Sequence, residues 1–235
     1  MLEIDNLQKS FGAKQALRGL DLKVAPGNVY ALLGPNGAGK TTAINTCLGF
    51  IEPDRGKVLV GDIDPAIDPM DVRALLAYIP ENVTLYGALT GLENLDYFSE
   101  LAGKRYGRQD LNVFLTRAGL PEEAMDRQVK TYSKGMRQKV GVAIALAKQA
   151  RLLLLDEPTS GLDPRASHEF SMLLGELSKE GMAILMATHD LFRARETASY
   201  IGIMVDGALK AEMRADETTS EEIERIYLEA THVSR

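Results

Sequence analysis

The sequence lacks most features that mark secreted or membrane-spanning chains. Cys47 is the only cysteine among 235 residues, which excludes an intrachain disulfide. A single thiol in an apolar segment is usually a buried small residue, and this usage fits a reducing compartment. The first residues have neither the basic head nor the apolar core of a signal peptide. No stretch approaches the ~18 uninterrupted apolar residues that a spanning helix needs. We expect a soluble, cytoplasmic protein that works at a membrane only through a partner that spans it.

An excess of positive charge is also missing. The chain has 27 cationic and 33 anionic side chains, a formal net charge of −6. Nucleic-acid binders usually carry a basic balance, so we expect no nucleic-acid partner. Hydrophobic residues make up 45% of the chain, which is enough for a substantial core. The length fits one large domain, or one domain with a subdomain.

The chain does contain a regular alternation of short apolar runs and helical patterns. Residues 1–11 and 15–24 alternate apolar and polar side chains, which predicts strands. Residues 85–150 have helical spacing with few β-branched residues, which predicts a helical subdomain. The apolar runs elsewhere alternate with helical segments, which predicts a mostly parallel α/β sheet with helices on both faces. Within the tail at 214–235, residues 218–235 begin with a Ser/Thr cap and an acidic turn, which predicts a short helical tail.

A phosphate-binding loop stands out at residues 34–41. The segment "GPNGAGKT" matches the pattern G-x-x-x-x-G-K-[ST] between an apolar run and a helical segment. Glycines let backbone N–H groups surround a phosphate, and the start of the following helix adds free N–H groups and a positive dipole end. In this pattern Lys40 reaches the terminal phosphates and the Thr41 hydroxyl ligates Mg²⁺. The alternative is an ordinary glycine-rich turn. The predicted nucleotide contacts in this loop are Asn36, Gly37, Gly39, Lys40, Thr41 and Thr42.

Two carboxylates and a histidine follow apolar runs later in the chain. Asp156 and Glu157 end the run "RLLLLDEP", and ligands of open α/β sheets bind at the C-terminal ends of strands. Asp156 is predicted to hold Mg²⁺ directly or through water, and Glu157 to orient or deprotonate an attacking water. The alternative is an acidic pair that caps a helix before Pro158. His189 ends the run "MAILMATH"; such a histidine is usually structural, but beside these motifs it is predicted to contact the γ-phosphate.

These motifs together resemble the nucleotide-binding domain of ABC (ATP-binding cassette) ATPases. The loop "GPNGAGKTT", the segment "LLLLDEPTSGLDP" and "ATHD" occur in that family's order, and the resemblance covers about residues 1–213. It implies a P-loop NTPase (RecA-like) core with an N-terminal antiparallel β subdomain and an α-helical subdomain inserted at about 85–150. Residues 214–235 would form a short tail. The implied cofactors are ATP and Mg²⁺, and the implied activity is ATP hydrolysis.

The segment "YSKGM", residues 132–136, falls where this family carries its signature loop, usually LSGGQ. Ser133 and Gly135 match that pattern, whereas the Leu, the first Gly and the Gln do not. The resemblance implies that Ser133 and Gly135 contact the nucleotide of a second subunit, so that two copies pair head to tail around two ATP molecules. Lys134 adds a cation to this surface, either on phosphate or simply solvated.

Three further residues carry roles that the resemblance implies. Phe11 matches the aromatic residue that stacks on adenine; the alternative is a core phenylalanine. Asp163 matches the acidic residue of a loop that crosses the dimer interface. Glu81 stands where the family usually has a glutamine that contacts Mg²⁺ and the water. A glutamate there could still ligate Mg²⁺, but it adds a negative charge near the γ-phosphate.

Two classes of function remain open from the sequence. The "YSKGM" form, Glu81 and the segment "PENVTLYGALTGLENL" look like the ATPases of ABC-2-type exporters, which sit on the inner face of the cell membrane and drive separate permease subunits. In that case Arg73, Tyr86 and Leu89 flank the groove for the permease. The alternative is a soluble ABC protein that acts on nucleic acid, the ribosome or iron–sulfur assembly. The chain has one cassette, no long coiled-coil insertion and an acidic balance, which favour the exporter class.

Overall fold

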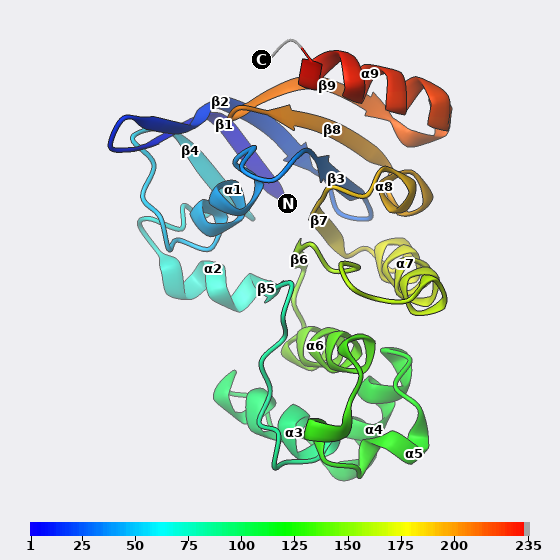
Figure 1. Cartoon of the computed structure of the whole chain (residues 1–235). Coiled ribbons are helices and arrows are strands. Elements are labelled where there is room, and N and C mark those ends of the chain that lie inside the picture. The colour runs from blue at the N-terminus through cyan, green and yellow to red at the C-terminus, as the bar shows by residue number, and fades with distance from the viewer. Residues whose placement is uncertain (233–235) are drawn as a thin grey trace.

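The computed structural model describes residues 1–232 and contains two sheets (Figure 1). The smaller sheet is antiparallel and follows the predicted N-terminal strands. Its strands are β1 (Leu2–Phe11), β2 (Lys14–Val24) and β4 (Arg55–Val60), in the order β2-β1-β4. Alternate side chains of β1 and β2 are buried, which explains why this segment alternates apolar and polar residues.

The larger sheet has six strands in the order β5-β6-β7-β3-β8-β9. All neighbouring pairs are parallel except β8 and β9, which form an antiparallel hairpin that turns at Asp206–Gly207. The central strands β3 and β6 are buried along their whole length, as their continuous apolar sequences predicted. The bounds are β3 (Val29–Leu33), β5 (Leu76–Ile79), β6 (Leu152–Asp156), β7 (Ala183–Thr188), β8 (Tyr200–Val205) and β9 (Ala208–Arg214).

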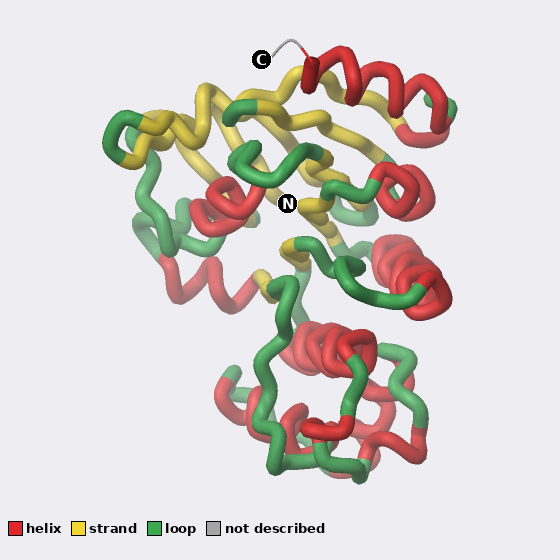
Figure 2. Tube along the Cα trace, viewed as in Figure 1, coloured by secondary structure: helices red, strands yellow, loops and turns green. Residues whose placement is uncertain are grey.

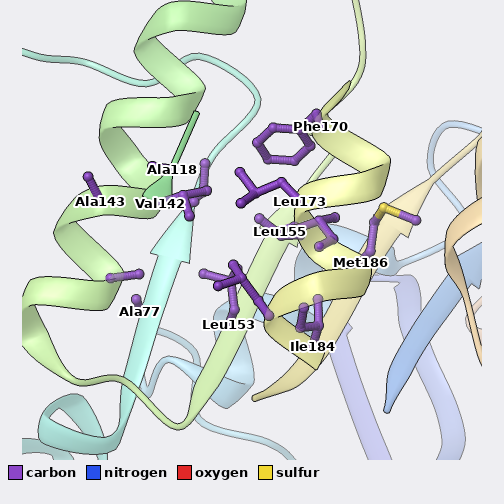
Figure 3. Packing of buried hydrophobic residues seen from close by; sticks show 14 of the residues in the cluster. Ala77, Ala118, Val142, Ala143, Leu153, Leu155, Phe170, Leu173, Ile184 and Met186 are labelled. Carbon is purple, nitrogen blue, oxygen red and sulfur yellow. The ribbon is translucent and has the colours of Figure 1, made fainter. Parts of the chain in front are cut away.

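Helices cover both faces of the larger sheet. Successive residues of β6 belong to two different hydrophobic cores: Leu153 and Leu155 pack with the α7 side, and Leu152 and Leu154 with the α1 side. Figure 3 shows Phe170 and Leu173 of α7 against the first pair. The two-sided α/β sheet is therefore confirmed. The helices around it are α1 (Lys40–Cys47), α2 (Pro69–Leu75), α7 (Pro164–Lys179), α8 (Leu191–Thr197) and α9 (Ser220–His232).

The helical region predicted at 85–150 lies below the sheet and contains almost no strand (Figure 2). Its first helix begins with a capping box, in which Thr90 and Glu93 satisfy each other's backbone N–H groups. The last helix, α6, packs closely on β5, where Gly141 leaves room for Ile79. This region contains α3 (Gly91–Leu101), α4 (Arg108–Arg117), α5 (Glu122–Met125) and α6 (Lys134–Lys148), with a 3₁₀ turn at Val129–Thr131.

Three smaller predictions also have an outcome. The helix after the phosphate loop is shorter than expected: it ends at Cys47, because Gly49 takes the left-handed conformation with φ +71°. Cys47 is fully buried as expected, and burial raises the pKa of its thiol to about 12. The tail helix α9 packs its buried Ile223 into the core, against α8 and β8. The predicted tail extends to residue 235, and residues 233–235 lie outside the described part. No helix of residues 1–232 is long and apolar enough to cross a membrane.

Candidate active site

The phosphate loop connects β3 to α1, and its backbone passes close to neighbouring chain. Gly39 lies just before α1 with φ +107°. A Cβ atom at this position would lie 2.5 Å from the carbonyl oxygen of Ala16 and 2.8 Å from Cε of Met204. Glycine is therefore required here for both torsional and steric reasons. The turn directs the start of α1 toward the C-terminal edge of the parallel strands.

Lys40 is buried at the start of α1 and carries the main positive charge of the loop. Its Nζ donates to the Gly34 carbonyl oxygen at 2.6 Å and to that of Pro35 at 3.3 Å. Nζ also lies 3.3 Å from Oε1 of Glu157. A buried ammonium needs such partners, and the carbonyl contacts hold it beside the loop. A phosphate oxygen in the loop would be a stronger partner for the same group.

Thr41 and Asp156 form the candidate magnesium site. Oγ1 of Thr41 donates to Oδ2 of Asp156 at 2.9 Å, and Oδ1 is buried with no hydrogen-bond partner among the described residues. Burial raises the pKa of Asp156 above its ordinary value; the Thr41 hydrogen bond opposes this rise and the nearby charge of Glu157 adds to it. A hydroxyl and an unsatisfied carboxylate oxygen are ligands that fit Mg²⁺. In residues 1–232 no cluster of three or more acidic, histidine or cysteine side chains completes a protein cage, so phosphate and water would supply the other ligands.

Glu157 is held in an unusual backbone conformation. Its φ is +48°, in the left-handed region that costs a residue with a Cβ about 1–2 kcal/mol. Its N–H donates to Ala187 O at 2.9 Å, and its carbonyl accepts from Ser160 N at 3.1 Å. Oε2 lies 2.8 Å from Nδ1 of His189, 32 residues away in the chain. The strain therefore sits at the one carboxylate that touches both Lys40 and His189.

A cavity of about 320 Å³ gathers most of the predicted site residues. Phe11 lies at its edge, and half of its surface is exposed, so the core alternative for this residue is wrong. Lys14 and Ala16, which the sequence did not single out, also line the cavity from β2. Lys14 stands three residues after Phe11, across the β1–β2 turn. This short spacing from a predicted adenine contact is the sequence signal that could have identified Lys14. The predicted residues that line the cavity are Phe11, Asn36, Gly37, Gly39, Lys40, Thr41, Thr42, Glu81, Asp156 and Glu157.

His189 does not line this cavity and meets it only through its contact with Glu157, and three further predicted residues lie apart from the cavity, at the starts of two helices. Ser133 caps α6, where its Oγ accepts from Met136 N at 3.2 Å. Gly135 is buried in the first turn of α6, close to Ala166 of α7. Asp163 caps α7 by accepting from Ala166 N at 2.9 Å. The structure of one chain therefore does not bring Ser133, Gly135 and Asp163 to the cavity.

Glu81 has partners that the sequence did not indicate. Its Oε1 accepts from Ser160 Oγ at 2.9 Å and from Lys134 Nζ at 3.4 Å. The Ser160 hydrogen bond lowers the pKa of Glu81, and Lys134 acts in the same direction. The buried amide of Gln138 donates to the Glu81 carbonyl oxygen at 3.1 Å. Ser160 sits inside the "DEPTSGLD" segment, but nothing in the sequence pairs it with residue 81.

A larger cavity, about 850 Å³, lies elsewhere, between the antiparallel sheet and the β8–β9 hairpin. Its lining mixes acidic side chains such as Glu3 and Asp21 with basic ones such as Lys23 and Arg214. It contains no glycine-rich loop and no helix start, so it lacks the features of a phosphate-binding loop. The smaller cavity, with its phosphate loop and acidic strand end, and with His189 against Glu157, defines a P-loop NTPase.

Comparisons with known proteins identify the family. The family model described as "ABC transporter" matches residues 17–160. The daunorubicin resistance ATP-binding protein DrrA3 of Streptomyces coeruleorubidus is 36% identical over 222 residues, covering 94% of this chain and 70% of that protein. The lantibiotic transport ATP-binding protein SrtF of Streptococcus pyogenes is 33% identical over 227 residues, covering 97% of this chain and 96% of that protein. The chain therefore belongs to the ABC transporter family.

Solved structures agree with this assignment. The ATP-binding subunit of an ABC transporter superposes with a TM-score of 0.82 at 32% identity, over 98% of this chain and 99% of that chain. A dimeric cassette bound to ADP and Pi superposes with a TM-score of 0.79 at 27% identity, over 92% and 99%. The chain is an ATP-binding subunit and an ATPase of the ABC transporter class. Its relatives are transporter proteins, which supports this class over the soluble alternative.

Proposed function

We propose that two copies of this chain hydrolyse MgATP between them and thereby drive a separate membrane permease of the exporter kind. The contacts of Glu157 carry the catalytic part of the proposal. One carboxylate oxygen lies 3.3 Å from the Lys40 ammonium and the other 2.8 Å from the His189 ring. A carboxylate held on both sides has a fixed direction, which is what positioning a water for attack requires.

The phosphates of ATP are proposed to bind in the glycine-rich loop. Lys40 exchanges its carbonyl partners for phosphate oxygens there, and the free N–H groups at the start of α1 complete the cradle. Thr41 and Asp156 would hold Mg²⁺, which supplies neutralisation of the phosphate charge. Phe11, which is half exposed at the cavity edge, offers its ring to the adenine.

Glu157 is proposed as the residue that takes the proton of the attacking water. His189 N also contacts Oε2 of Glu157 at 3.3 Å, so the backbone and the ring of one residue both fix this carboxylate. The His189 side chain is 54% exposed, which leaves it free to meet the γ-phosphate. Phosphoryl transfer depends mainly on positioning and charge neutralisation, and these residues supply both.

The second subunit is proposed to close over the first through the start of α6. The Ser133 oxygen accepts a bond from Met136 N, which leaves its O–H free to donate to a phosphate of the facing subunit. The helix start adds N–H groups and a positive dipole end. The position of Ser133, Gly135 and Asp163 outside their own cavity supports this head-to-tail pairing, as does the similarity to a dimeric cassette.

The permease is proposed to dock on exposed apolar side chains beside α2 and α3, which would place the chain on the cytoplasmic face of a membrane. Phe50, Ile67 and Met70 are 64%, 73% and 72% exposed, and their neighbours line a cavity of about 490 Å³ that includes Arg73. Tyr86 stacks edge-on with Tyr97 of α3, and both are exposed. Exposed apolar groups of this size usually mark contact surfaces. The names of the relatives, for drug resistance and lantibiotic transport, support an exporter.

The test of the catalytic proposal is Glu157→Gln. The variant keeps the side-chain shape and one acceptor oxygen but cannot accept a proton, so we expect ATP binding to persist and turnover to fall by about 10²–10⁴-fold. The trapped ATP should then hold a dimer, measured by light scattering after size exclusion with MgATP and with MgADP. Lys40→Ala is the matched control and should lose nucleotide binding itself. Undiminished hydrolysis by Glu157→Gln would remove Glu157 from this role.

A further inference from the structure

Glu81 and Lys134 are two positions where this chain departs in charge from the pattern of its family, and the structure places them in contact. Nζ of Lys134 lies 3.4 Å from Oε1 of Glu81, although 53 residues separate them. Glu81 follows β5 at the sheet edge, and Lys134 is the first residue of α6. One departure adds a negative charge and the other a positive charge. The two changes therefore compensate each other across the fold.

The position of Lys134 explains why it needs an anion. The start of a helix has free N–H groups and a positive dipole end, which disfavour a cation. The first turn of α6 contains no acidic residue that would offset this. The Lys134 side chain is only 26% exposed, so water screens it incompletely. Glu81 supplies the missing negative charge from a different element.

The negative charge of Glu81 is also unfavourable where it lies, unless a cation offsets it. It lines the same cavity as Asp156 and Glu157, so it is a third carboxylate at the place where the phosphates of ATP must bind. The Lys134 ammonium, which does not line the cavity, offsets the negative charge of Glu81. The neutral bond from Gln138 to the Glu81 carbonyl is independent of these charges. Helix α6 therefore remains attached to this loop even when the ion pair opens.

We propose that the Glu81–Lys134 pair is an ionic latch in the single subunit, and that Lys134 leaves Glu81 for a nucleotide phosphate of the facing subunit when ATP closes the dimer. This inference rests on the proposed head-to-tail dimer. Lys134 is adjacent to Ser133 on the same helix start, so a phosphate that meets Ser133 also meets Lys134. A polyphosphate carries more negative charge than one carboxylate and competes for the cation. Glu81 is thus a positioning residue that restrains closure through Lys134.

The test is a double-mutant cycle on ATP-driven dimerisation in the Glu157→Gln background. Four proteins are compared: the native pair, Glu81→Gln, Lys134→Met and the double variant. We expect Glu81→Gln to lower the ATP concentration for half-maximal dimer about two- to fivefold when Lys134 is present, as for a partly exposed ion pair. With Lys134→Met in place, the part of this effect that comes from releasing Lys134 should vanish, so Glu81→Gln should act differently with and without Lys134. Two residues that act independently would give additive effects instead.

The controls separate the latch from other roles of these residues. Lys139→Met breaks the 2.9 Å ion pair between α6 and Glu169 of α7, away from the cavity, and should show no coupling to Glu81→Gln. Added salt at about 0.5 M should shrink the effect of Glu81→Gln, because exposed charges are screened. An effect of Glu81→Gln that is the same with and without Lys134 would mean that Glu81 acts through Mg²⁺ alone, and would overturn the latch.

A second readout, made without nucleotide, keeps the latch testable if no dimer forms. If none of the four proteins dimerises with ATP, the proposed function fails, but the ion pair of the single subunit remains to be measured. Amide hydrogen exchange of residues 134–138 should then be faster in Glu81→Gln, where Lys134 stays at the helix start without its anion, than in the native pair and in the double variant, and unchanged in Lys139→Met. Equal exchange in the native pair and its variants would show that no latch exists.

Discussion

Gly39 shows how one residue fixes the geometry of the phosphate loop. The positive φ of this residue turns the chain into α1, and the Ala16 carbonyl leaves no space for a side chain. Glu157 has a similar torsional cost without being glycine, and its turn directs the carboxylate to Lys40 and His189. Both residues are therefore strained or constrained at the proposed phosphate site.

Gly39→Ala should abolish nucleotide binding and destabilise the fold by about 1–3 kcal/mol, because it adds both torsional strain and a steric clash. Gly181→Ala, outside the phosphate cavity, is the matched control. Gly181 also has a positive φ, of +101°, but an added Cβ would meet nothing within 4 Å. The control variant should lose only the stability that the torsional strain costs, which is the smaller part. Thermal unfolding and ATP binding by calorimetry measure both; equal losses in the two variants would contradict the role of the Ala16 and Met204 contacts.

At the scale of elements, a clasp of three side chains joins α7 to α8. Arg193, which is nearly buried, donates to Glu196 Oε2 at 2.5 Å and to the Pro164 carbonyl oxygen at 3.1 Å. Glu196 also contacts Nδ1 of His168 on α7. Helix α7 starts directly after Asp163, and α8 starts two residues after His189. The clasp therefore fixes the spacing between the loops that carry these two site residues.

The clasp predicts a pH-dependent stability. Burial alone would raise the pKa of Glu196, but hydrogen bonds from His168 and Arg193 outweigh it and hold the pKa below the ordinary 4.5. A lowered carboxyl pKa gives stability that is complete above 4.5 and is lost as the pH falls through the folded-state value. Glu196→Gln should therefore cost about 1–3 kcal/mol at neutral pH, as for a charged hydrogen bond.

The stability gap between the native chain and Glu196→Gln should close as the pH falls below about 4.5. Urea unfolding followed by circular dichroism from about pH 7 to pH 3.5 measures this gap. Glu224→Gln, at an exposed position of α9, is the control and should show no such closure. A gap that stays constant with pH would mean that Glu196 acts through its shape and not its charge.

At the scale of the whole molecule, two exposed surfaces are the ones proposed to meet partners. Ser133, Gly135 and Asp163, at the starts of α6 and α7, lie outside the subunit's own cavity, and exposed apolar side chains lie near α2 and α3. The Glu81–Lys134 pair lies between the cavity and the first of these surfaces. Helix α6 packs on β5 and on α3 and α4, so it joins the sheet to the helical region.

Met70→Glu should prevent permease binding while leaving ATP binding intact, because it places a charge on the proposed docking surface. Tagged Glu157→Gln protein, isolated with MgATP from detergent-solubilised native cells, should retain a polytopic membrane protein, identified by mass. Adding Met70→Glu should reduce that protein at least about tenfold, the equivalent of ~1.4 kcal/mol. Val113→Glu, on the exposed face of α4, is the control. Recovery of only soluble partners, ribosomes or nucleic acid would contradict the transporter proposal.

The sequence predicted the elements well because the signals for them are local. Hydrophobic periodicity indicated the strands and the helical region, and the glycine-rich loop stood out because its turn depends on adjacent residues. The end of α1 was placed two residues too late, because Gly49 turns the chain after Leu48. The sequence left open whether Phe11 is buried or exposed, because the pattern around an aromatic residue at a strand end is the same in both cases.

By itself, then, the sequence determined the order of the elements, the phosphate loop and the acidic strand end. Only the tertiary structure decided which of these residues meet. The sheet order β5-β6-β7-β3 differs from the chain order, so it brings Glu157 to His189, and Glu81 to Ser160. The helical region inserted between β5 and β6 returns Lys134 to the same sheet edge and leaves Ser133 facing outward. Contacts of this kind depend on how distant segments pack, which no local pattern specifies.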